Sequence, residues 1–87
     1  MQIKKELIKR TIAGDTVLVP VGKTVYDANG LFILNEVGAF LWDRLPAAEN
    51  EEALLEQLLE EYDVSRQVAK QDVSEFLENL RAMDILE

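Results

Sequence analysis

The side chains of this sequence that could support chemistry are mostly carboxylates. The sequence contains no histidine and no cysteine, which excludes the commonest general base, a thiolate nucleophile and the usual zinc ligands. The clustered acids Glu51, Glu52, Glu56, Glu60 and Glu61 alternate with leucines at helical spacing. We interpret these acids as the solvated face of an amphipathic helix, because charge runs of this kind usually form its outer half.

The remaining polar residues do not form a ligand motif. Asp15, Asp27 and Asn29 lack the spacing of a calcium-binding loop. The four glycines recur at every eighth position, but none belongs to a phosphate-binding motif. The sequence therefore predicts no catalytic constellation, no metal site and no cofactor.

The charge balance limits the class of partner. Nine Lys and Arg residues stand against seventeen Asp and Glu residues, which gives a formal net charge of −8. Nucleic-acid binding depends on cations that neutralise phosphates, so an acidic chain is poorly suited to it. We expect no nucleic-acid partner.

Length and composition indicate one domain that spans residues 1–87. The 87 residues are 48% hydrophobic and 30% charged, which is ordinary for a soluble globular chain. No apolar run approaches the roughly 20 residues of a membrane span. The first ten residues lack an apolar signal segment. We expect a cytoplasmic domain without membrane association.

The first third of the sequence predicts three strands. Apolar and β-branched runs at residues 7–12 and 16–19 flank a turn at Gly14-Asp15 and predict a hairpin. The apolar run Leu31–Leu34 follows the turn signal Asn29-Gly30 and predicts a third strand, without a charge or proline to protect its edge. Its alternate side chains must point to opposite faces. One pair of side chains then points away from the core. These two are either covered by other elements or line an apolar groove for a partner, and the pattern is compatible with both arrangements.

Three helices are predicted after the strands. They cover residues 36–45, a segment that begins at Glu51, and residues 66–83. Each is preceded by a residue that can cap a helix: Asn35, Asn50 and Ser65. The apolar residues of the third helix share one face: Ala69, Val73, Phe76, Leu77 and Leu80. The sequence thus predicts an α+β fold, a three-stranded antiparallel β-meander followed by three helices.

The ordered strings of the sequence resemble the PqqD-like family. The matching features are the VLVP strand, the LN and GAFLW strings at the strand–helix junction, the leucine helix that ends EEYDVS, and the final DVSEFLENLRAMDILE. The resemblance covers roughly residues 8–86. This family includes the coenzyme PQQ synthesis protein D and the peptide-recognition domains of ribosomal-peptide maturation systems. The resemblance implies a winged-helix-like domain without catalytic activity.

The resemblance also implies a role for the edge of the third strand. In this family the leader segment of a precursor peptide adds to that edge as a further strand, packs against the third helix and is delivered to a modifying enzyme, often a radical-SAM enzyme. The peptide-binding residues expected here are Leu31, Phe32, Ile33, Leu34, Val68, Asp72, Phe76 and Asn79. The segment 21–30 is longer than the tight hairpin expected of the PQQ member, which favours a relative that serves another peptide.

Two other functions remain as alternatives. A winged-helix DNA-binding regulator would have a similar order of elements, although the acids of residues 66–83 are as numerous as its three basic residues. A structural subunit could instead form a homodimer through the edge of Leu31–Leu34. Charge on the third helix and the dependence of molecular size on concentration distinguish these alternatives from a peptide-binding adaptor.

Overall fold

The computed structural model describes residues 1–22 and 32–87, in which three strands are followed by the helices. The elements are β1 (Leu7–Ile12), β2 (Asp15–Pro20), β3 (Phe32–Leu34), α1 (Glu36–Arg44), the 3-10 helix η2 (Leu45–Ala47), α2 (Glu51–Glu61) and α3 (Arg66–Ala82). The strands form one antiparallel sheet in the order β1-β2-β3. The predicted α+β fold is confirmed. The predicted turn at Asn29-Gly30 and the first residue of the predicted third strand, Leu31, lie outside the described residues.

The β1–β2 hairpin is present as predicted, but its turn lies one residue earlier than the sequence suggested. Ile12 pairs with Asp15, so the turn residues are Ala13 and Gly14 rather than Gly14-Asp15. Their φ angles of 52° and 87° are both positive, as a two-residue type I′ turn requires. The twist of such a turn matches that of the strands, so Asp15 becomes the first residue of β2.

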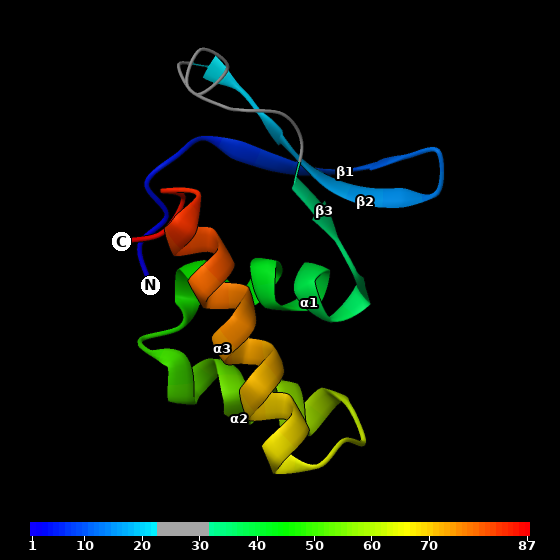
Figure 1. Ribbon diagram of the computed structural model, residues 1–87, viewed down its shortest axis with the longest axis vertical. Helices are drawn as coiled ribbons and strands as arrows, with labels where there is room; N and C mark the ends of the chain where they lie inside the picture. Colours follow the sequence, from blue (N-terminus) through cyan, green and yellow to red (C-terminus); the bar gives the residue numbers. More distant parts are fainter. Residues whose placement is uncertain (23–31) are drawn as a thin grey trace.

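The three α-helices lie on one side of the sheet (Figure 1). Leu18 of β2 and Leu34 of β3 are buried in the same core cluster as Leu41 of α1. Val17 of β2 pairs with Ile33 of β3. Because successive strand residues point to opposite faces, these two side chains lie on the face of the sheet away from the helices.

Each α-helix begins at its predicted cap. The side-chain oxygens of the three caps accept hydrogen bonds from backbone N–H groups three residues later: Asn35 from Gly38, Asn50 from Ala53 and Ser65 from Val68. The helix α1 ends at Arg44, one residue before the predicted end, and Pro46 lies within η2. A proline lacks the N–H that would continue an α-helical ladder.

The apolar face of α3 occupies the centre of the core. All five residues of the predicted stripe are buried: Ala69, Val73, Phe76, Leu77 and Leu80. Ile85 and Leu86, in the short segment after α3, are also buried, as predicted. A β-bridge joins Leu86 to Ile3, so the two ends of the chain lie together near the end of α3 (Figure 1). No helix in residues 1–22 and 32–87 combines the length and the apolar composition that crossing a membrane requires.

Candidate functional site

A groove lies between β3, the start of α1 and one side of α3. Its volume is about 160 Å³. The groove is lined by Phe32, Ile33, Leu34, Asn35, Val37, Gly38, Leu41, Asp72, Glu75, Phe76 and Asn79. Residues from the strand and from α3 therefore meet at one place, although about 40 positions separate them in the sequence.

The strand β3 forms one wall of this groove and has an open edge. One side of β3 pairs with β2, and no strand of the described chain pairs with the other side. The N–H and C=O groups along such an edge can pair with another extended chain. Leu34 is 5% exposed and fixes the strand in the core, whereas Ile33 is 66% exposed.

The helix α3 forms the opposite wall. Asp72, Glu75, Phe76 and Asn79 follow each other at i, i+3, i+4 and i+7, so they share one helical face. Phe76 is 8% exposed and closes the groove on the core side. Asp72, Glu75 and Asn79 are exposed. This wall is apolar at its base and polar at its rim.

The junction of β3 and α1 shapes the end of the groove. The Oδ1 atom of Asn35 accepts a hydrogen bond from the Gly38 N–H at 2.7 Å, so the strand passes directly into the helix. A Cβ atom on Gly38 would lie 3.2 Å from Asn35 Oδ1 and 3.4 Å from Leu34 Cδ2. A glycine at this position therefore lets α1 approach the strand closely.

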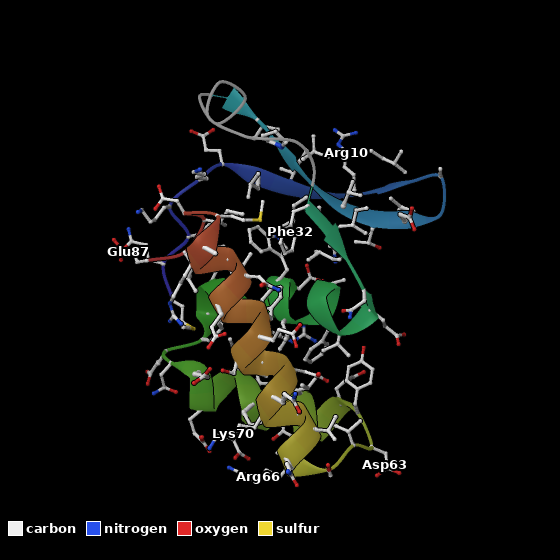
Figure 2. All side chains as sticks on the ribbon, viewed as in Figure 1. Arg10, Phe32, Asp63, Arg66, Lys70 and Glu87 are labelled. Atoms are coloured by element: carbon white, nitrogen blue, oxygen red, sulfur yellow. The ribbon has the colours of Figure 1, made fainter. Side chains whose placement is uncertain are left out.

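Six of the predicted peptide-binding residues line this groove: Phe32, Ile33, Leu34, Asp72, Phe76 and Asn79. Figure 2 shows the ring of Phe32 between the sheet and the helices. Val68 does not line the groove; it lies one turn before Asp72 on the same helical face and is 48% exposed. Leu31 lies outside the described residues.

The sequence interpretation missed the α1 residues of the lining, the cap residue before them and one acid of α3. The missed residues are Asn35, Val37, Gly38, Leu41 and Glu75. Helical spacing from Asp72 could have identified Glu75, because i and i+3 are neighbours on a helix. No sequence signal marks the α1 residues, because apolar positions next to a strand are equally typical of core packing.

The basic residues of α3 lie away from the groove. Arg66 binds Glu52 and Glu56 of α2 at 2.6 and 2.9 Å, and the hydrogen bond to Glu56 raises the pKa of Arg66 above its usual range. Lys70 and Arg81 lie on the other border of the buried stripe. Figure 2 places Arg66 and Lys70 at the end of the molecule that is distant from Phe32. All charged residues of the groove lining are therefore carboxylates.

The groups of the groove are suited to recognition of an extended chain. They combine open backbone groups on β3, an apolar base and carboxylates at the rim. Within residues 1–22 and 32–87, no three His, Cys, Asp or Glu side chains converge as a metal site would need. The site therefore offers hydrogen bonding, apolar contact and negative charge.

Comparisons with known proteins agree with the resemblance seen in the sequence. Among solved structures, the chain is similar to one described as TbiB1 in complex with the TbiA(beta) leader peptide, with a TM-score of 0.74 and 26% sequence identity. That match covers 100% of this chain and 95% of the other. No curated protein matches the sequence significantly. The model of the family described as coenzyme PQQ synthesis protein D (PqqD) matches residues 15–86, and this chain therefore belongs to the PqqD family.

Proposed function

We propose that this protein is a non-catalytic adaptor that binds the leader segment of a ribosomally made precursor peptide and presents it to a modifying enzyme. The observation that carries this proposal is the open edge of β3 beside a groove whose other wall is α3. A peptide strand added to β3 would satisfy the open backbone groups, while pockets for alternate side chains would select its sequence. The leader peptide in the similar solved structure supports a precursor peptide as the partner of this chain.

The proposed binding residues are those predicted from the sequence. Phe32, Ile33 and Leu34 would pair with the peptide backbone, and Asp72, Phe76 and Asn79 would contact its side chains. Val68 would lie about 6 Å beyond Asp72 along α3. A peptide that reached Val68 would therefore extend past the lining of the groove. Leu31 remains a proposed member of the strand edge.

The proposed partner enzyme belongs to the radical-SAM class, which is an expectation from the family resemblance. The proposed absence of catalysis rests on the residue types of the sequence, which has neither histidine nor cysteine. A cytoplasmic location, a single domain and a chain without a cofactor remain predictions. It also remains a prediction that the protein binds a precursor peptide other than that of PQQ.

A DNA-binding role receives little support from the charges. The net charge is −8, and the side of α3 that borders the groove carries Asp72 and Glu75. A recognition helix that faced phosphates would need basic residues there. A homodimer formed through β3 remains an alternative, which the molecular mass at several protein concentrations would detect.

The test is an NMR titration with a leader peptide. The probe is the leader of the precursor encoded beside the gene of this protein, and a scrambled version of the same peptide is the control. We expect the leader to shift the backbone amide signals of residues 32–34 and 72–79, and the scrambled peptide to leave them unchanged. Shifts confined to β1 or α2 would contradict the proposed site. If the neighbouring genes encode neither a small peptide nor a radical-SAM enzyme, this would count against the proposed partners.

A further inference from the structure

The two acids on the rim of the groove have no counter-ion among the residues that the structure describes. Four acids form the ion pairs of the described chain: Asp43 with Lys9, Asp84 with Lys4, and Glu52 and Glu56 with Arg66. Asp72 and Glu75 form none of these pairs and stand three positions apart on α3. Like charges at this spacing repel each other and weaken a helix. No ion pair among the described residues offsets this repulsion.

The basic residues that could neutralise these acids are held elsewhere. Arg66 forms ion pairs with two acids of α2, and Lys70 and Arg81 lie on the other border of the buried stripe. Arg44 of α1 lies over the ring of Phe40, with its Cζ atom 4.4 Å from the ring centroid. The groove lining itself contains no Lys or Arg among the described residues. No Lys or Arg of residues 1–22 and 32–87 thus pairs with Asp72 or Glu75, and a ligand could supply the positive charge.

The spacing of α3 matches that of a bound strand. Asp72 and Phe76 are four residues apart, which is a rise of about 6 Å along the helix. Side chains on one face of a strand repeat every second residue, which is a distance of about 7 Å. A strand whose apolar side chain covers Phe76 would therefore bring its neighbour on the same face to the acidic rim.

We infer that the peptide bound at β3 carries a lysine or an arginine two positions from the apolar residue that fills the groove. This inference rests on the proposed function and adds the chemistry of the ligand. The charged pair would form at a site that peptide binding partly shields from water, where it is stronger than in open solvent. An acidic residue at the same position of the peptide would be repelled.

The charge also disfavours a second copy of the chain as the occupant. The described residues of β3 are Phe32, Ile33 and Leu34, which offer no cation to Asp72 and Glu75. Pairing of two β3 edges would also bring together two acidic α3 rims. A cationic, apolar peptide fits both the base and the rim of the groove, whereas the described residues of a second copy's β3 fit only the base.

A library of random peptides displayed on phage tests this inference. It is selected separately against the unmodified protein, the double variant Asp72→Asn/Glu75→Gln and the matched double variant Glu60→Gln/Glu78→Gln. Both variants lose two negative charges, but Glu60 and Glu78 do not line the groove. We expect the unmodified protein and the matched variant to enrich Lys or Arg two positions from an apolar residue. We expect the groove variant to enrich the apolar residue alone.

A peptide selected by the unmodified protein then gives the size of the effect. Exposed ion pairs contribute little individually, so its dissociation constant should rise roughly threefold to tenfold in the groove variant and stay unchanged in the matched variant. A circular dichroism spectrum and a urea unfolding curve of each variant show whether it is folded.

The outcomes separate the inference from the proposed function. Enrichment of apolar residues without a cation would overturn the inference and leave the proposed function intact. A cation preference that survives in the groove variant would also overturn it. If no peptide is selected, or if the selected peptides leave the amide signals of residues 32–34 unchanged, the proposed function itself fails.

Discussion

The two edge strands of the sheet are built differently. The strand β1 carries Lys9 and Arg10, whereas the three residues of β3 are all apolar. Charged residues on an edge strand, lysine above all, discourage pairing with another chain. Figure 2 shows Arg10 pointing away from the helices, and Lys9 is tied to Asp43 of α1 at 2.5 Å. The edge of β1 is therefore protected, and that of β3 is open.

The support behind the two strands differs as well. In β1 only Leu7 is partly buried and the other residues are exposed, and the turn end of the hairpin projects beyond the helices (Figure 1). In β3, Leu34 is buried in the core, and the groove lies beside the strand. The open edge is the one that the core holds in position. A site that accepts a strand needs such rigidity, because the edge must not change shape when the ligand pairs with it.

The largest expected effect tests whether the core holds β3. The substitution Leu34→Ala removes a side chain that is almost fully buried, and we expect it to lower the free energy of unfolding by about 2–5 kcal/mol. The neighbouring substitution Ile33→Ala removes an exposed side chain and should change that free energy by less than about 1 kcal/mol. Urea denaturation measures both. Equal losses would show that the two side chains support the strand alike.

A smaller loss is expected at the junction between β3 and α1. The substitution Asn35→Ala removes the oxygen that caps α1 and should lower the free energy of unfolding by about 1 kcal/mol. Asn35→Asp keeps a capping oxygen and serves as the control, with little expected loss. Urea denaturation measures the free energy of unfolding of both variants. If the alanine and aspartate variants were equally unstable, the cap would not be the reason for the loss.

Charge on the open edge should weaken peptide binding with little change in stability. Ile33→Lys gives β3 the kind of residue that protects β1, and we expect the leader peptide to bind roughly twofold to fivefold more weakly, because an apolar cross-strand contact is lost. Isothermal titration calorimetry measures the affinity. The same change on the protected strand, Ile8→Lys, is the matched control. A loss of affinity in this control, or none in Ile33→Lys, would contradict the difference between the edges.

The smallest effect concerns the chain that leads into β1. Lys4 binds Asp84, and this hydrogen bond lowers the pKa of the Asp84 carboxyl below its usual range. The pair therefore adds stability above about pH 4, and this contribution is lost as the pH falls through the lowered pKa of folded Asp84. Both side chains are exposed, so Asp84→Asn should destabilise less than the changes at Leu34 and Asn35.

Urea denaturation of the unmodified protein and of Asp84→Asn at several pH values checks this expectation. The two proteins should differ slightly at pH 7 and converge in strong acid. A difference that persisted at about pH 2, where aspartates are protonated, would show that the ion pair is not its cause.

The elements of this fold were predictable from the sequence because their signals are local. The caps at Asn35, Asn50 and Ser65 act over three residues, and the apolar stripe of α3 repeats within two turns. The hairpin turn was misplaced by one residue, because Gly14 fits either position and only the pairing of Ile12 with Asp15 decides between them.

The candidate site was predictable only in part. The sequence by itself determined the absence of histidine and cysteine, the negative charge, the apolar strand without protection and the two polar borders of α3. The tertiary structure decided that the border with Asp72 and Asn79 faces β3 and that Gly38 and Leu41 of α1 close the groove. Helical periodicity gives the position of each residue around the helix axis. It cannot say which side of the helix contacts a strand that lies about 40 positions earlier in the sequence. That choice depends on how the whole helical layer packs against the sheet.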